Sequence, residues 1–374
     1  MKSAQKNYYS THKMNSLIKK LNDSSKTANN NYNFFNIFGI GMKLNLRGKL
    51  AKKELISMLK SLFDRYYLHL SRELSYSVLS LSTLGFKFSV KDSEITIEFA
   101  PYSERLDIPL NLFSEVELLN LLDLARLTFK FGGILTIGKI NIPDRINKPI
   151  IRIILSEKVV EIEKCCKMHL SAIDPWTFTE TFVLKIHDIW NLDGKTILDI
   201  GAEVGDTSLF YASKRASVYA VEPVHFNLLN KNIEINREYK INTANLAMGN
   251  QSSLKFWFDD LIVDGSASAY IHKSHKKFVE TKTLPLAKII EYFGLKSIDY
   301  LKSDSKGGEF SITETDLAMI NLGFLIEYTT ENPKQLKTLI EIIKNAKFDY
   351  RIFNHNPISD EDVFHHGTIV GWRQ

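Results

Sequence analysis

The stretch KTILDIGAEVGDTSLFYA, residues 195–212, decides the fold because it joins a short apolar run to a turn that contains two glycines. The run TILDI predicts a buried strand, and GDTSLFYA predicts a helix. Gly201 and Gly205 stand between them, where a side chain would block the approach of a ligand and restrict the backbone. A strand, a tight turn and a helix in this order are typical of the first unit of a parallel sheet.

The chain after residue 181 repeats this alternation of strand and helix. SVYAVEP (217–223) predicts a strand, FNLLNKNIEIN (226–236) a helix, and NTANLAM (242–248), SIDYLKSD (297–304) and GFLIEYT (323–329) further strands. FDYRIFN (348–354) and GTIVGWR (367–373) follow with no helix between them, which favours an antiparallel hairpin at the sheet edge. We therefore expect an α/β, Rossmann-like sheet with an antiparallel C-terminal edge hairpin.

The turn after the first strand predicts the chemistry of the ligand. Its G-x-x-x-G spacing is not the dinucleotide fingerprint, and no Lys-Ser/Thr pair follows as in a phosphate-binding loop. Asp199 before the first glycine would repel phosphate but would favour a cation or an amine. Glu222 ends the next strand, where an acid is suited to accept hydrogen bonds from ribose hydroxyls. Together these residues indicate a nucleoside cofactor with an amino group and a positive centre, S-adenosylmethionine.

The segment from Ile197 to Asn236 resembles the FkbM-type S-adenosylmethionine-dependent methyltransferases. Further matches are NLAMGN (245–250), GSASAY (265–270) and IDYLKSDSKGGEF (298–310), and the resemblance covers residues 174–374. It implies a class I methyltransferase fold, S-adenosylmethionine as cofactor, and O-methylation of a sugar, a glycan or a small-molecule hydroxyl.

The resemblance also implies roles for individual residues. Asp199 and Gly201 would hold the methionine part of the cofactor, Glu222 the ribose, and Leu246 and Ala247 would lie near the adenine. The remaining positions implied to bind the cofactor are Glu180 near its methionine end, Ala202, Gly205 and Asp206 in the loop, and Pro223 after the second strand. The sequence departs from the family at Lys306 and Pro285, where the family usually has acids, and this bears on acceptor chemistry.

Three residues are candidates for catalysis because methyl transfer to a hydroxyl needs a group that takes its proton. Asp304 is a base or an acceptor-orienting group, or else a ligand of the cofactor loop. Lys306 could stabilise a developing alkoxide, and His366, beside His365 before the last strand, could serve as a general base. No spacing of carboxylates, histidines or cysteines argues for a metal site.

Composition divides the chain into three parts. Residues 1–48 carry eight Lys and Arg against one acid, Asp23, and are expected to form a disordered basic tail. Residues 49–165 are expected to form a small α+β domain, with a strand pair at 86–99 and a helix that Ser114 and Glu117 cap. Residues 166–374 are expected to form the methyltransferase domain.

The same composition bounds partners and compartment. The chain has a net charge of +5. Residues 1–48 carry +7 and residues 49–374 carry −2, so the folded body has no overall basic field for nucleic acid. Two adjacent cysteines and no apolar run of 18 residues indicate a cytoplasmic protein without a membrane span. The alternatives to a small-molecule or glycan acceptor are an RNA or protein methyltransferase and a cofactor-binding protein without catalysis.

Overall fold

The computed structural model describes residues 33–37, 40–44, 86–91, 94–99, 104–109, 112–131, 134–137, 140–142, 150–258, 277–330, 332–357 and 365–373. Most of the predicted tail, residues 49–85 and the 265–270 run lie outside these residues. The chain divides into two compact units, Met1–Leu70 and Ser71–Gln374. In the first, strands β1 (Asn33–Ile37) and β2 (Ile40–Leu44) pair antiparallel.

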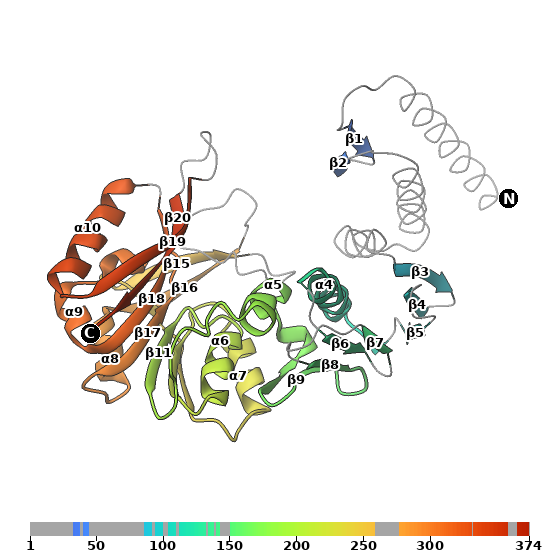
Figure 1. Ribbon diagram of the computed structural model, residues 1–374, viewed down its shortest axis with the longest axis horizontal. Coiled ribbons are helices and arrows are strands. Elements are labelled where there is room, and N and C mark those ends of the chain that lie inside the picture. Colours follow the sequence, from blue (N-terminus) through green and yellow to red (C-terminus); the bar gives the residue numbers. More distant parts are fainter. Residues whose placement is uncertain are drawn as a thin grey trace. The chain divides into compact units, whose positions relative to one another are not determined.

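The first described elements of the second unit are three short antiparallel strands and a helix (Figure 1). Strands β3 (Phe86–Lys91), β4 (Glu94–Phe99) and β5 (Glu104–Pro109) form a meander, which confirms the predicted strand pair. Helix α4 (Glu115–Phe131) follows, and the predicted capping is confirmed: Glu117 N–H donates to Ser114 Oγ at 3.3 Å, and Ser114 N–H donates to Glu117 Oε2 at 2.8 Å.

A five-stranded sheet lies next to α4 in the sequence. Its strand order is β10-β9-β8-β6-β7. The strands are β6 (Ile134–Ile137), β7 (Ile140–Ile142), β8 (Ile150–Ile154), β9 (Val159–Ile162) and β10 (Cys166–His169). Short helices η2 (Leu170–Ala172), α5 (Pro175–Phe178) and η3 (Thr179–Leu184) lead from β10 to the large sheet.

The large sheet has seven strands in the order β13-β12-β11-β17-β18-β20-β19. They are β11 (Thr196–Ile200), β12 (Ser217–Val221), β13 (Ile241–Ala244), β17 (Ile298–Ser303), β18 (Ile320–Thr330), β19 (Asp349–Pro357) and β20 (His365–Trp372). The first five pair in parallel, whereas β20 runs antiparallel to both β18 and β19. This order confirms the predicted Rossmann-like fold and its C-terminal antiparallel hairpin.

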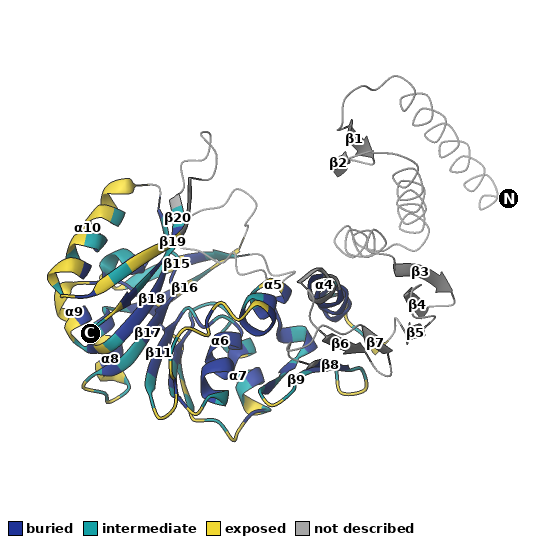
Figure 2. Ribbon diagram, in the orientation of Figure 1, coloured by how far each residue is buried: buried dark blue, intermediate teal, exposed yellow. Residues whose placement is uncertain are grey.

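Five helices cover the two faces of this sheet. Helices α8 (Leu286–Tyr292), α9 (Glu314–Ala318) and α10 (Pro333–Asn345) pack on the face that carries Ile200, Leu301 and Ile326. Helix α6 (Asp206–Ser213) contacts β11 and β12, and α7 (Phe226–Glu234) packs Leu229 against Ala220. Figure 2 shows the central strands buried between these layers and the outer side of α10 exposed.

The two sheet faces differ in chemistry because strand residues alternate between faces. Asp199 and Lys302 stand in register on β11 and β17, and Leu325 follows on β18. The neighbouring register of Ile200, Ser303 and Ile326 belongs to the apolar face. The face towards α6 therefore carries ionisable residues at the carboxyl ends of the central strands.

A three-stranded sheet, in the order β14-β16-β15, contributes residues to the carboxyl end of the large sheet. Its strands are β14 (Ala247–Met248), β15 (Ser253–Phe258) and β16 (Lys277–Leu284). Pro285 then takes the N-cap position of α8 and cannot cap it with a side chain. Asp316 of α9 replaces that function, because its Oδ1 accepts a hydrogen bond from the Ala287 N–H at 2.8 Å. The departure at Pro285 thus has a structural compensation.

Candidate functional site

A cleft opens at the carboxyl ends of β11, β12 and β17. Its volume, including the part that is open to solvent, is about 580 Å³. Seven of the predicted site residues line it: Gly201, Glu222, Pro223, Leu246, Ala247, Asp304 and Lys306. It is also lined by Thr177, Ile200, Glu203, Val221, Val224, His225, Met248, Phe256 and Ser305, which were not predicted as site residues. A ligand in a doubly wound fold binds at this edge of the sheet.

The loop from Gly201 to Gly205 forms one wall through an unusual backbone path. Gly201 has φ +74°, and a Cβ there would lie 2.1 Å from the backbone oxygen of Asp304. Gly205, with φ +94°, would place a Cβ 2.8 Å from Leu229 Cδ1. The space that a side chain at Gly201 would fill is therefore occupied by the backbone of Asp304, at the end of β17. The loop can approach β17 closely because Gly201 has no side chain.

Glu222 occupies the middle of the cleft wall. Its Oε2 accepts from the Glu203 N–H at 2.9 Å, and its Oε1 accepts from the Val224 and His225 N–H groups at 2.6 and 2.8 Å. Burial raises the pKa of Glu222, while these three backbone donors favour its ionised form. The donors hold the carboxylate in one orientation, so it can accept hydrogen bonds from a ligand without reorganising.

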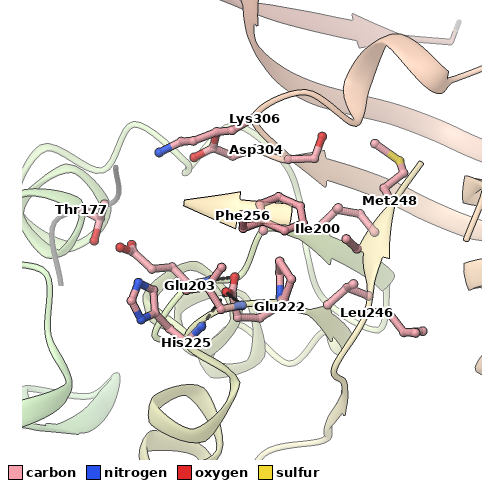
Figure 3. Close-up of a pocket in the computed structure, with 16 residues that line it drawn as sticks. Thr177, Ile200, Glu203, Glu222, His225, Leu246, Met248, Phe256, Asp304 and Lys306 are labelled. Atoms are coloured by element: carbon pink, nitrogen blue, oxygen red, sulfur yellow. Dashed lines mark hydrogen bonds between the residues drawn. The ribbon is translucent and has the colours of Figure 1, made fainter. Parts of the chain in front are cut away.

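One end of the cleft is apolar. Leu246, Ala247 and Met248 are buried on or beside β14, and Phe256 of β15 is 4% exposed. Figure 3 shows Leu246, Met248 and Phe256 on one side of Glu222, with Glu203 and Thr177 on the other. An aromatic heterocycle fits the apolar end, and a polar group fits the other.

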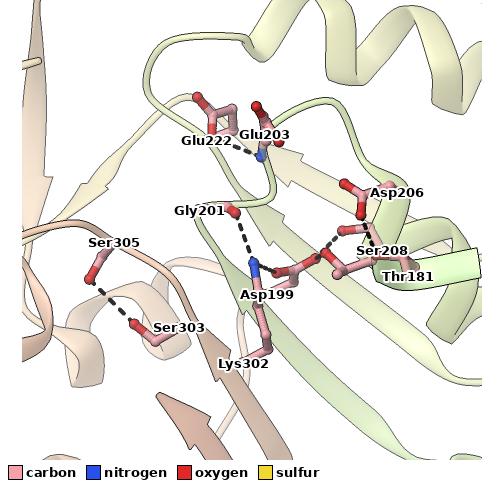
Figure 4. A network of polar contacts seen from close by, with 11 residues as sticks. Thr181, Asp199, Gly201, Glu203, Asp206, Ser208, Glu222, Lys302, Ser303 and Ser305 are labelled. Carbon is pink, nitrogen blue, oxygen red and sulfur yellow. Dashed lines mark hydrogen bonds and ion pairs between the residues drawn. The ribbon is translucent and has the colours of Figure 1, made fainter. Parts of the chain in front are cut away.

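Asp199 lies beneath the loop and is absent from the cleft lining (Figure 4). Its Oδ2 accepts from Thr207 Oγ1 at 2.7 Å and Ser208 Oγ at 2.6 Å, and its Oδ1 lies 3.4 Å from Lys302 Nζ. Lys302 Nζ also donates to the backbone oxygen of Gly201 at 3.0 Å. Asp199 thus joins β11, α6 and β17 behind the loop.

Burial of this network changes the protonation of its members. Burial lowers the pKa of Lys302, but Asp199, Asp304 and Glu327 raise it by more, so the ammonium stays charged. Burial, with a contribution from Lys302, lowers the pKa of His187 to about 4 and keeps its imidazole neutral. The network therefore supplies one fixed positive charge directly behind Gly201.

Five other predicted residues also lie outside the cleft lining. Asp206 accepts from Thr181 Oγ1 at 2.5 Å, and Ala202 packs against Ala220 and Leu229. Gly205 is the N-cap of α6. His366 pairs with Thr329 in the sheet, and Glu180 belongs to η3. Burial raises the pKa of Glu180, and Asp206 and Asp304 add to the increase. Glu180 is thus electrostatically coupled to the β17 end.

The carboxyl ends of β17 and β18 bring together two acids and a lysine. Ser303 at the end of β17 pairs with Ile326, so Asp304, the next residue, follows beside Glu327 of β18. Burial raises the pKa of Glu327 to about 8, with Asp304 as the next cause. Burial lowers the pKa of Lys306, but Asp304, Glu203 and Glu327 raise it by more. These side chains form one electrostatically coupled group.

Sequence reasoning did not select Glu203, Lys302 or Glu327. Glu203 is the middle residue of the G-x-x-x-G loop, and Lys302 and Glu327 each lie shortly before the end of a strand that the sequence predicted. A rule that every ionisable residue within three positions of a parallel strand end is a candidate would have found Lys302 and Glu327.

The cleft and the order of the strands agree with the family comparison. Residues 199–351 match the model of the methyltransferase FkbM domain. Residues 199–351, in the C-terminal part of the chain, form a methyltransferase FkbM domain. The cofactor of this methyltransferase domain is S-adenosylmethionine.

Solved methyltransferase structures share low similarity with the chain. Fibrillarin from Aeropyrum pernix, in complex with S-adenosyl-L-methionine, is 14% identical over 76% of this chain and 97% of its own, with a TM-score of 0.34. Magnesium protoporphyrin IX methyltransferase from Synechocystis PCC 6803 is 12% identical over 53% of this chain and 79% of its own, with a TM-score of 0.31. A search of curated proteins gives no match.

Two further properties concern only the residues that the structure describes. Among them, no group of three or more His, Cys, Asp or Glu side chains could hold a metal ion. None of their helices combines the length and apolar character that crossing a membrane requires.

Proposed function

We propose that the cleft of the FkbM domain binds S-adenosylmethionine and that the enzyme methylates a hydroxyl group of a sugar, a glycan or another small molecule. The position of Glu222 carries this proposal. Its carboxylate, held by three backbone N–H groups, lies between the apolar and the charged ends of the cleft. It is placed to accept from the ribose hydroxyls, with the adenine against Leu246, Ala247 and Phe256.

The acceptor needs a base because a hydroxyl is a weak acid. S-adenosylmethionine, when bound, supplies an electrophilic methyl group on a sulfonium. We assign the acceptor proton to the carboxylates of Asp304 and Glu327. The carbon–sulfur bond would break with its electron pair on sulfur as the acceptor oxygen bonds to the methyl carbon, and the carboxylate of Asp304 or Glu327 would take the acceptor proton.

Two observations support this assignment. Asp304 lines the cleft, and the register of β17 and β18 places Glu327 beside it. The pKa of Glu327, raised to about 8 by burial and by Asp304, lies near the pH at which a general base works best. Neither Glu327 nor His366 lines the cleft, but only Glu327 follows beside Asp304 in the register of β17 and β18, so we leave His366 out of the proton transfer.

The proposal is tested by following a labelled methyl group. The protein is incubated with S-adenosylmethionine labelled in the methyl carbon and with fractions of a cell extract, and each fraction is then treated with mild alkali. We expect label in the small-molecule or glycan fraction, in a form that resists alkali, because methyl ethers resist it and methyl esters do not. Label in RNA or protein instead would overturn the proposed acceptor class.

Variants separate catalysis from cofactor binding. Asp304→Asn and Glu327→Gln should lower the incorporation of label by about 10²–10⁴-fold, the usual contribution of a general base, and leave the cofactor affinity within about threefold. Glu291→Gln, at an exposed residue of α8, is the control and should match the unmodified protein. Binding of the cofactor with no label in any fraction would favour a protein without catalysis.

A further inference from the structure

The charged end of the cleft holds two residues with a rare backbone conformation. Glu203 has φ +49° and Lys306 has φ +46°, in the left-handed region that side chains other than glycine seldom adopt. Both residues line the cleft. Figure 3 shows both side chains extending towards the end at Thr177, opposite the apolar end. Such backbone strain concentrates at binding and active sites.

Glu203 carries an unsatisfied acceptor at this end. Its Oε1 is buried and has no hydrogen-bond partner among the residues that the structure describes. Burial raises the pKa of Glu203. The charges of Asp174, Asp206 and Glu222 add to this increase, and that of Lys306 opposes it. A buried carboxylate oxygen without a donor is costly, so this arrangement indicates that a ligand supplies the donor.

The cofactor has one group with the matching chemistry. If the adenine lies against the apolar end and the ribose at Glu222, the aminoacyl part of S-adenosylmethionine extends towards the charged end. This part is a zwitterion, with an ammonium and a carboxylate on one carbon. A carboxylate and a lysine on opposite walls complement both charges.

We propose that Glu203 and Lys306 hold the aminoacyl end of the cofactor, with Glu203 accepting from the ammonium and Lys306 pairing with the carboxylate. This inference rests on the cofactor placement proposed above. It gives Lys306, which departs from the family pattern, a role in binding instead of in acceptor chemistry. Asp199, behind the loop, then acts on the cofactor only through Lys302 and Gly201.

Two nucleosides isolate the aminoacyl end in a binding experiment. S-adenosylhomocysteine and 5′-deoxy-5′-methylthioadenosine are both uncharged at sulfur, and only the first has the aminoacyl group. Calorimetry on the full chain should give tighter binding of S-adenosylhomocysteine. Glu203→Gln and Lys306→Met should each lower the affinity for S-adenosylhomocysteine by about tenfold or more. They should lower the affinity for methylthioadenosine by less than about twofold.

Matched variants make the outcomes separable. Glu222→Gln should lower the affinity for both nucleosides to a similar degree, because both contain the ribose. Glu291→Gln, at an exposed residue, should change neither affinity. If Glu203→Gln weakens both nucleosides equally, the aminoacyl assignment is wrong and the cofactor placement stands. If Glu222→Gln leaves both affinities unchanged, or if neither nucleoside binds the unmodified protein, the placement fails and the inference fails with it.

Discussion

At the scale of single residues, Gly201 is constrained twice, by its positive φ and by the Asp304 backbone oxygen. Gly194 offers a comparison within the same chain, because its φ is +69° and nothing lies within 4 Å of a Cβ built there. An alanine at either position is strained by about 1–2 kcal/mol for the left-handed backbone. Only at Gly201 does it also meet an atom, at 2.1 Å.

Gly201→Ala should therefore destabilise the protein clearly more than Gly194→Ala, and only Gly201→Ala should lower the affinity for S-adenosylhomocysteine. Urea denaturation and calorimetry on the two variants measure both effects. Equal losses of stability would mean that the backbone conformation alone, and not the contact with β17, accounts for the glycine.

Glu327 gives a prediction with a defined sign in pH. Its pKa is raised from 4.5 to about 8, so between these values the folded protein binds a proton that the unfolded chain has released. The folded state is then destabilised as the pH rises through this range. Glu327→Gln should stabilise the protein at pH 9 by at least about 1.4 kcal/mol, which corresponds to one pKa unit, and should have little effect near pH 4.5. Thermal denaturation at both pH values tests this, and a variant that is less stable at pH 9 would contradict it.

At the scale of elements, the junction of β11, α6 and β17 depends on a buried ion pair. The side chains of Lys302 and Asp199 are 5% and 0% exposed. Removal of one partner leaves a buried charge without its counterion, which typically costs about 3–5 kcal/mol. The exposed pair of Lys288 and Glu291 on α8 should contribute less than about 1 kcal/mol.

Lys302→Met should accordingly lower the free energy of unfolding by about 3–5 kcal/mol, and Lys288→Met by less than about 1 kcal/mol. The double variant Lys302→Met/Asp199→Asn should lose less than the sum of its single variants, because the two residues interact. Urea denaturation of the unmodified protein, Lys302→Met, Asp199→Asn and the double variant measures the coupling, and strict additivity would show that the pair is not coupled.

The elements of the FkbM domain could be predicted because their patterns are local. TILDI and SVYAV are short apolar runs with an acid next to their last residue, and the absence of a helix between residues 354 and 367 indicated the hairpin. The direction of the Asp199 side chain could not be predicted, since it depends on Lys302, about a hundred residues further along the chain. The role of Glu327 likewise follows from the register of β17 with β18, which the sequence of neither strand specifies.

At the scale of the whole molecule, α4 links the part of the chain before residue 165 to the segment that follows. Leu121, Leu122, Leu124 and Leu127 of α4 are buried. Asn120 Nδ2 donates to the Leu170 oxygen at 2.8 Å. The domain boundary predicted between residues 165 and 166 falls in the turn between β9 and β10, which pair antiparallel. This boundary remains a proposal that truncation can test.

A fragment of residues 112–374 should be more stable than a fragment of residues 166–374, because each fully buried leucine contributes about 1.5–3 kcal/mol. Thermal denaturation of both fragments, with binding of S-adenosylhomocysteine as the check on folding, gives the comparison. Equal melting temperatures would support the boundary between residues 165 and 166.

The hydrogen bond from Lys302 to the Gly201 oxygen spans 101 residues of chain, and the Asp304 N–H closes the same junction by donating to the Ile200 oxygen at 2.9 Å. Because the N-terminal part of a protein leaves the ribosome first, β11 and the glycine loop emerge long before β17. The loop can pair early with β12, since the Gly201 N–H donates to the Val221 oxygen at 2.9 Å, but its contacts with Lys302 and Asp304 form only after β17 has been translated and has paired with β11. A nascent chain therefore becomes able to retain its cofactor late in synthesis, and cofactor binding favours chains in which the central strands have already found each other.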